Sequence, residues 1–142
     1  MLIQNVQAGQ SLVFRLPYGE DLLQSLTDIC RDKGIQAGKV EVIGAVQSAA
    51  VAYYDQENQE YHRLELPGEW EILSCLGNIS LKDGQAMVHA HILLADSQGK
   101  AFGGHLVQGC SIFAGEGFIQ EFLGASLNRG LDATTGLTLW QE

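Results

Sequence analysis

The stretch that decides the fold is "HAHILLADSQGKAFGGH", residues 89–105, because it predicts two antiparallel strands and the turn between them. Its two ends hold three of the four histidines of the chain. Ser97-Gln98-Gly99 fits a three-residue hairpin loop, a type I turn whose third residue takes the left-handed conformation that glycine accepts easily. This loop fixes the register of the hairpin and places His91 opposite His105.

The register brings the three histidines to one face. Side chains alternate along a strand, so His89 and His91 point the same way, about 7 Å apart. Directly opposite side chains lie about 5 Å apart at Cβ, which lets the imidazole of His105 join them. A slip of one residue would turn His105 into the other face. That face is predicted to be an apolar layer of Val88, Ala90, Ile92, Leu94, Phe102, Gly104 and Leu106.

The histidine face predicts a metal site formed by His89, His91 and His105. Three protein ligands with an open fourth position are typical of catalytic zinc sites, whereas structural sites are usually closed by four. Imidazole also suits nickel, copper and iron. The alternative is that three surface or interface histidines cluster without an ion. The fourth histidine, His62, is interpreted as an ordinary strand residue.

Two neighbours of the histidines bear on access to the site. Gly103 leaves space beside them where a ligand can approach. Leu93 and Val107 share their face, which favours its burial by another copy of the chain, by a loop or by the C-terminal tail.

Outside the hairpin, β-branched and aromatic residues at alternating positions predict further strands. The strands are expected at residues 11–16, 39–46, 49–54, 60–66, 70–82, 85–95, 101–107 and 110–119. Leu22, Leu26 and Cys30 recur at helical spacing before Gly34, which predicts one amphipathic helix over residues 20–33. The predicted fold class is therefore α+β, built on an antiparallel sheet with one main helix.

The composition argues against nucleic-acid binding and against a cysteine-based zinc site. The net charge is −9, and the eight Lys and Arg residues are scattered singly, which offers few cations for neutralising phosphates. The three cysteines are far apart and show no Cys-x-x-Cys spacing, so neither a disulfide framework nor a thiolate zinc site is indicated. A chain of 142 residues without an apolar run of membrane length or a secretory signal is expected to be one cytoplasmic domain, residues 1–142.

The hairpin and its surroundings resemble the PPC (plant and prokaryote conserved) domain from about Leu12 to Leu139. The matching stretches are "FRLPYGEDLLQSL", "VEVIGAVQSAAVAYYD", "GEWEILSCLGNISL", "VHAHILLADSQGKAFGGHLVQGC", "AGEGFIQEF" and "LNRGLDATTGLTLW". The resemblance implies an antiparallel, sandwich-like sheet flanked by helix. It also implies a homotrimer that binds zinc through the histidines of the His-x-His strand and of Gly-Gly-His. These histidines are His89, His91 and His105 in this chain. The architecture is also similar to that of acetolactate decarboxylase, which holds zinc with comparable histidines and uses carboxylates and an arginine near the metal.

The plant members of this family contact DNA through a separate AT-hook, and their PPC portion mainly mediates association with partners. This chain has no Arg-Gly-Arg-Pro hook. The plant segment Gly-Arg-Phe-Glu-Ile-Leu reads Gly-Glu-Trp-Glu-Ile-Leu over residues 68–73, with Glu69 in place of arginine. A DNA-binding label on prokaryotic members therefore rests on the fold rather than on a site.

Three functional hypotheses follow. The first is a metal-dependent small-molecule binder or lyase-type enzyme, in which an open zinc polarises a carbonyl or activates water. Its candidate catalytic residues are Glu71 and Glu116, which are otherwise solvated or interface carboxylates, and Arg63 or Arg129 could orient an anionic substrate. The second is a DNA-associated regulator, and the third is a purely structural trimeric module. The charge favours the first over the second.

Overall fold

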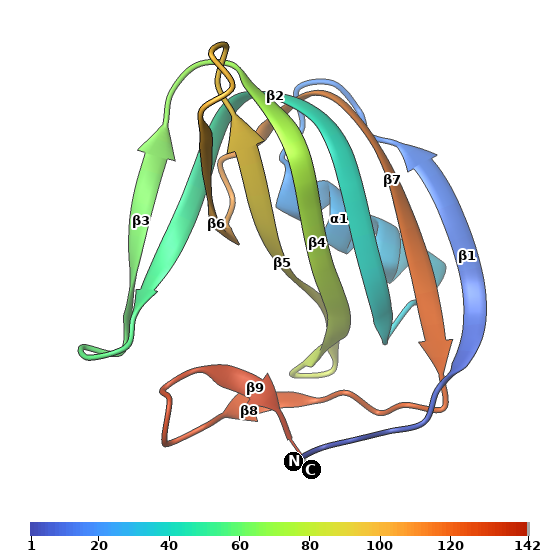
Figure 1. Cartoon of the computed structure of the whole chain (residues 1–142). Coiled ribbons are helices and arrows are strands. Elements are labelled where there is room, and N and C mark those ends of the chain that lie inside the picture. Colours follow the sequence, from blue (N-terminus) through green and yellow to red (C-terminus); the bar gives the residue numbers. More distant parts are fainter. Residues whose placement is uncertain (142) are drawn as a thin grey trace.

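The computed structural model of the chain describes residues 1–141. Over these residues it contains a large antiparallel sheet, one helix and a small C-terminal hairpin (Figure 1). In chain order, the elements are β1 (Gln7–Arg15), α1 (Leu22–Lys33), β2 (Gly38–Asp55), β3 (Glu60–Leu66), β4 (Trp70–Lys82), β5 (Gln85–Ala95), β6 (Ala101–Leu106), β7 (Ser111–Leu123), β8 (Arg129–Leu131) and β9 (Thr138–Trp140). The α+β fold class predicted from the sequence is confirmed.

The helix begins and ends at the residues that its sequence signals indicate. The carboxylate of Asp21 accepts a hydrogen bond from the backbone N–H of Gln24 at 2.9 Å, which caps the first turn. Gly34 takes the left-handed conformation, with φ of 70°, and closes the last turn. Leu22, Leu26 and Cys30 are fully buried, so α1 packs the apolar stripe predicted for it against the sheet.

The segment predicted as two strands, 39–46 and 49–54, forms the single long strand β2 instead. Irregularities in register between Val42 and Ser48 bend it without ending it. Gly44 permits the bend, because its φ is +147° and an added Cβ would lie 2.1 Å from the carbonyl oxygen of Ala114. The first half of β2 pairs with β4 and β7, and the second half pairs with β3 and β6.

The strand order of the large sheet is β1-β7-β2-β4-β5-β6, with β3 added to β2. A further pairing joins β6 to β2 through Leu106 with Val51 and His105 with Ala52. Strands β2, β4, β5 and β6 therefore form a closed ring. The closure brings the histidine hairpin beside the β2–β3 hairpin, although β4 lies between them in the chain.

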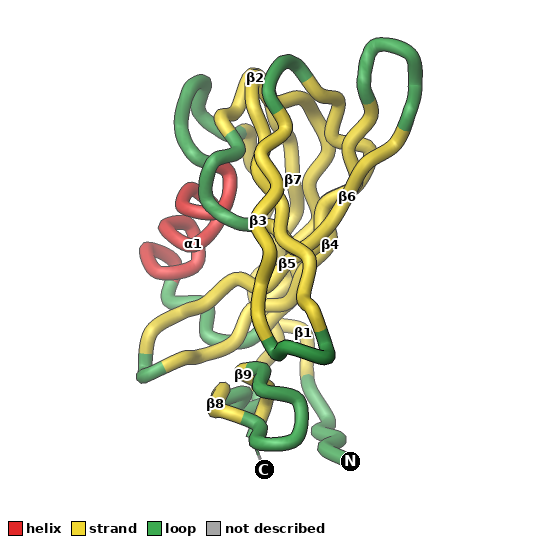
Figure 2. Tube along the Cα trace, turned by 90° about the vertical axis from the view of Figure 1, so that its left-hand side faces the viewer, coloured by secondary structure: helices red, strands yellow, loops and turns green. Residues whose placement is uncertain are grey.

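The helix covers one face of the sheet, and the core lies between the two layers (Figure 2). Strand β5 contributes the side chains of Val88, Ala90, Ile92 and Leu94, which are all buried as predicted. Phe102 departs from the prediction of a continuous apolar layer, because it remains 36% exposed and packs edge-on against Trp70. The histidines occupy the opposite face of the same strands.

The C-terminal hairpin of β8 and β9 was not predicted from the sequence. It lies below the open end of the sheet, near both chain termini (Figure 1). The backbone N–H of Leu81 donates to the carbonyl of Leu127 at 2.8 Å, which joins the approach to β8 to the end of β4. No helix within residues 1–141 is long and apolar enough to cross a membrane.

Candidate metal centre

The turn between β5 and β6 sets the register that the sequence predicts. Gly99 has φ of 77°, and its N–H donates to the carbonyl of Asp96 at 2.9 Å. The strand pairs then run from Ala95 with Ala101 to His91 with His105. His91 and His105 are therefore directly opposite, and His89 follows on the same face of β5.

The three histidines converge. Their ring centroids lie 5.5 Å apart for His89 and His91, 4.9 Å for His89 and His105, and 5.6 Å for His91 and His105. One ligand nitrogen from each lies within 4.8 Å of the others. Nitrogens around a tetrahedral zinc ion lie roughly 3.4 Å apart, so small side-chain rotations suffice to close the group on an ion.

The surroundings of His89 and His105 favour the neutral imidazole, which is the form that binds metals. Burial, followed by the charges of His105, Arg129 and His91, lowers the pKa of His89 to about 4. Burial also lowers the pKa of His105, with smaller contributions from His91 and Arg129. The buried Nδ1 of His105 has no hydrogen-bond partner within residues 1–141. Neutral rings and an unpartnered buried nitrogen fit a metal ion.

The histidines line a pocket of about 650 Å³ between the β2–β3 hairpin and residues 134–137, which we call the C-terminal segment. The pocket walls combine tyrosine rings, amides and hydroxyls with small apolar residues. They are formed by Ala52, Tyr53, Tyr54, Gln56, Gln59, Tyr61, His89, His91, Gly104, His105, Thr134, Thr135 and Leu137. Among residues 1–141, no aspartate or glutamate lines these walls.

Tyrosines from the β2–β3 hairpin make one side of the site. The ring of Tyr61 packs on His105 with a centroid separation of 5.0 Å, and Tyr54 packs on Tyr61 at 4.9 Å. The hydroxyl of Tyr54 donates to the carbonyl of Thr135 at 2.6 Å, which fastens the C-terminal segment to the pocket. Burial raises the pKa of Tyr61, so its hydroxyl keeps its proton.

Arg129, at the start of β8, is the nearest charged side chain to the cluster. Its Nη2 lies 3.3 Å from Nδ1 of His89 and also donates to the side-chain oxygen of Asn78 at 2.6 Å. Its Nε donates to the hydroxyl of Ser80 at 2.7 Å, and its Nη1 to the carbonyl of Thr138 at 2.9 Å. A guanidinium can only donate, so Nδ1 of His89 accepts here.

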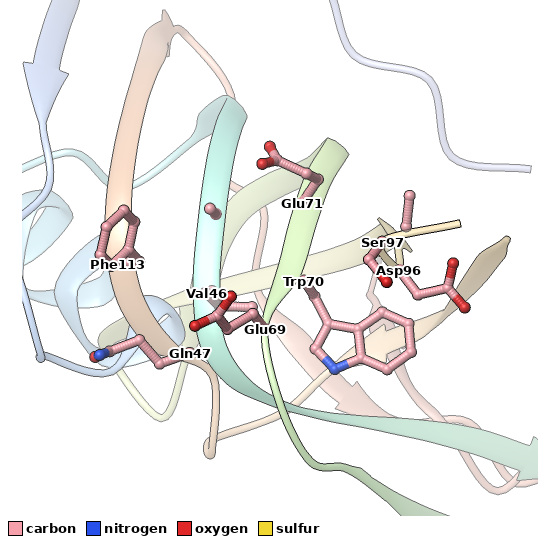
Figure 3. Close-up of a pocket in the computed structure, with 10 residues that line it drawn as sticks. Val46, Gln47, Glu69, Trp70, Glu71, Asp96, Ser97 and Phe113 are labelled. Atoms are coloured by element: carbon pink, nitrogen blue, oxygen red, sulfur yellow. The ribbon is translucent and has the colours of Figure 1, made fainter. Parts of the chain in front are cut away.

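The two carboxylates named as candidate catalytic residues lie elsewhere on the chain. Glu71 and Glu116 line one hollow of about 520 Å³ together with Arg15, and no histidine lines it. Glu71 also lines a second hollow of about 260 Å³, where Figure 3 shows it with Trp70, Asp96 and Phe113. Glu71 pairs with Ala95 and Leu76 pairs with His91, so the carboxylate lies five residues along β4 from the nearest histidine of the cluster, roughly 17 Å.

The remaining candidates divide between the site and the surface. Arg129 lies beside the histidines. Arg63 instead pairs with Glu65 on the exposed strand β3 and does not line the histidine pocket. His62 also stays apart and lies 3.4 Å from Glu60. No sequence signal marks Tyr61 as part of the site, because its contact with His105 depends on how β2 bends and on how β6 pairs with it.

Comparison with known proteins identifies relatives over nearly the whole chain. A family model described as the Plants and Prokaryotes Conserved (PCC) domain matches residues 3–123. A metal-containing protein from Archaeoglobus fulgidus has a similar structure, with 41% identity, a TM-score of 0.95 and full coverage of both chains. A plant- and prokaryote-conserved (PPC) protein from Pyrococcus horikoshii is 37% identical, with a TM-score of 0.94, covering 100% of this chain and 98% of the other.

More distant comparisons show the fold or part of a larger protein. A candidate DNA-binding protein from Bacteroides thetaiotaomicron is 24% identical with a TM-score of 0.85 over 96% of each chain, which shows the fold alone. The bifunctional protein GlmU of Synechococcus sp. JA-3-3Ab is 36% identical over 124 residues, which cover 86% of this chain and 19% of that protein. The chain therefore spans about a fifth of the length of this curated relative.

Proposed function

This chain belongs to the Plants and Prokaryotes Conserved domain family, and from that premise we propose that it is a homotrimeric protein that binds zinc through His89, His91 and His105. The observation that carries the proposal is the convergence of three imidazoles, with ligand nitrogens within 4.8 Å of one another, at the wall of an open pocket. The metal-containing relative from Archaeoglobus fulgidus supports it.

The proposed activity is small-molecule binding or lyase-type chemistry at the metal. Three ligands from the chain leave a coordination position free, and a zinc ion held there would supply Lewis acidity to a carbonyl or to water. The tyrosines of the β2–β3 hairpin and the C-terminal segment would shape the pocket around the bound molecule. As part of this proposal, Glu71 and Glu116 remain candidates for a catalytic role only if another copy of the chain supplies them, since neither lines the histidine pocket.

An exposed apolar face supports the assembly. On the side of the sheet away from α1, strand pairing connects Val13 with Phe118, Phe118 with Glu41, Glu41 with Leu76 and Leu76 with His91. We call this side the outer face; its exposed apolar residues are Val13, Ile43, Leu76, Leu93 and Phe118. Exposed apolar side chains gathered on both sides of Glu41 are typical of an interface. The row leads to His91, so the assembly would lie beside the metal site.

The location and domain organisation belong to the same proposal. Cys30, Cys75 and Cys110 are buried free thiols, as expected for a protein of a reducing compartment, which we take to be the cytoplasm. The chain is proposed to act as one domain.

Metal analysis of protein purified without chelators tests the proposal. We expect one zinc ion per chain in the natural protein. In His91→Ala and His105→Ala, affinity should fall by more than the roughly 10- to 100-fold that loss of an outer partner of a metal ligand costs. His62→Ala is the matched control, because His62 is exposed and lies outside the cluster, and it should keep its metal. A protein that takes up no transition metal at saturating concentration would refute the proposal.

DNA association is the second candidate, favoured by the description of the Bacteroides thetaiotaomicron structure. The charge of −9 opposes it, because non-specific affinity comes largely from cations that neutralise phosphates. Fluorescence anisotropy with duplex DNA at low salt distinguishes DNA association from the metal-dependent function. Binding that weakens steeply as salt rises would favour the DNA function, and a flat titration would dispose of it.

A purely structural role for the metal is the remaining alternative. Size-exclusion chromatography with light scattering, before and after chelation, distinguishes it. A trimer that survives metal removal would point to a chemical role for the ion, and a trimer that dissociates would point to an architectural one.

A further inference from the structure

We propose that the metal centre selects an anionic small molecule, an organic oxyanion such as a carboxylate or phosphate ester, and that Arg129 is the residue that imposes this preference. The inference rests on the proposed metal function and names the class of ligand for that site.

The first step is the charge balance of the pocket. Three neutral imidazoles leave the double charge of a divalent ion uncompensated. No aspartate or glutamate lines the histidine pocket among the described residues. Charges removed from water are costly unless an opposite charge accompanies them. Because the described residues of the chain supply no such charge at this pocket, we assign it to the ligand.

The second step is the position of Arg129, which adds a further positive charge beside His89. Its partners Ser80, Asn78 and Thr138 contribute neutral oxygens at 2.6 to 2.9 Å, and they hold the guanidinium in one orientation. Within residues 1–141 it forms no ion pair with a carboxylate. A fixed and unpaired guanidinium beside a cation site favours an oxyanion, which this side chain recognises well.

The third step is access to that charge. Arg129 lines a narrower hollow of about 300 Å³, which shares Tyr61, His89 and His105 with the main pocket. One acidic residue, Glu60, lines this hollow as well, but its side chain is 61% exposed and lies 3.4 Å from the ring of His62. A ligand at the open metal position can thus reach the side of the site where Arg129 lies.

The fourth step concerns the remainder of the ligand. The Tyr61 hydroxyl makes no hydrogen bond to another residue within 1–141, so it is free to donate to a ligand oxygen. The Tyr54 hydroxyl is already committed to Thr135. The rings of these two tyrosines and the side chain of Leu137 offer apolar contact. The walls therefore suit a compact organic molecule that carries an oxyanion at one end.

The test compares two probes of the same shape that differ in charge, lactate and lactamide, together with inorganic phosphate. Protein loaded with Co²⁺ in place of zinc is titrated with each, and the visible absorption bands of the cobalt report entry of a ligand at the metal without any turnover. We expect lactate or phosphate to bind at least 10-fold more tightly than lactamide. In Arg129→Gln this preference should fall at least threefold, with the remainder coming from the charge of the metal itself, while one Co²⁺ per chain is retained.

Arg63→Gln is the matched control, because it removes the same charge from an arginine that lines neither pocket, and it should keep the full preference. Arg129→Lys retains the positive charge but not the planar guanidinium, and it should keep part of the preference for lactate over lactamide. Equal binding of lactate and lactamide by the natural protein, which needs no variant, would overturn the inference. So would an unchanged preference in folded Arg129→Gln. Failure to load Co²⁺ at all would instead count against the proposed metal function.

Discussion

At the scale of single residues, the ring of His105 is held in position to serve as a metal ligand. Its Nδ1 is buried without a hydrogen-bond partner, an arrangement that costs about 1–3 kcal/mol when nothing binds. Packing against Tyr61 and pairing with Ala52 hold the ring in place regardless. The cost is understandable if a cation completes the site.

The lowered pKa values of His89 and His105 predict how the stability of the metal-free protein depends on pH. Both rings stay neutral in the folded state at pH values where the unfolded chain, with an ordinary histidine pKa near 6.5, takes up protons. The unfolded state thus binds more protons below about pH 6.5, and the free energy of unfolding falls as the pH drops toward 4. Urea unfolding in chelator at pH 7.5 and pH 5.0 should show this loss.

The window above pH 5 isolates the histidines, because the pKa of Asp55 is lowered to about 2 and that of Asp132 is also lowered. Replacing both His89 and His105 by glutamine should flatten the pH dependence in this window. His62→Gln, at an exposed position, should leave it unchanged. Equal stability of the natural protein at both pH values would contradict the assignment of neutral rings.

The sequence could predict the three histidines and could name Arg129 as a candidate, but it could not place Arg129 or Tyr61 beside them. A three-residue loop ending in Gly99 determines strand pairing over a few residues, so His91 and His105 follow from local rules. Arg129 and Tyr61 reach the site through contacts between distant segments. Arg129 lies 40 residues from His89 and arrives on a short hairpin with no strong pattern of its own. No spacing argument links such residues.

At the scale of elements, strand β2 is the part that the sequence misjudged. The predicted break between residues 46 and 49 is a bend, because the pairs on both sides shift register there instead of ending. Alternation along the chain marks where a strand is regular, and a bulge interrupts the alternation much as a turn does. The two cannot be separated until the partner strands are known.

Gly44→Ala is predicted to destabilise the protein strongly. The φ of +147° disfavours any side chain, and the new Cβ would lie 2.1 Å from the carbonyl oxygen of Ala114 on β7. We expect a loss of roughly 3 kcal/mol or more in the free energy of unfolding, measured with urea.

Gly84→Ala is the matched control for this change. Gly84 also has a positive φ, +75°, but nothing lies within 4 Å of its added Cβ, so only the backbone conformation is penalised. Its loss should be about 1 kcal/mol. Similar losses in the two variants would show that the contact with β7 does not matter.

At the scale of the whole molecule, the outer face predicts a test of assembly. Leu76 lies on this face opposite His91 and is 56% exposed. Leu76→Lys should shift the mass measured by light scattering from that of the proposed trimer toward the 15.4 kDa subunit. Leu64→Lys is the control, since Leu64 is 52% exposed on β3 and pairs with Val51, outside the outer face. A trimer unaffected by Leu76→Lys would place the interface elsewhere.

The closed ring of strands gives the histidines a second consequence. The join between β2 and β6 consists of two residue pairs, and His105 belongs to one of them. An ion shared with His89 and His91 would cross-link β5 to β6 and hold β6 in place. A bound ion would then slow amide hydrogen exchange along β6, and loss of the ion would let this short strand open locally more often.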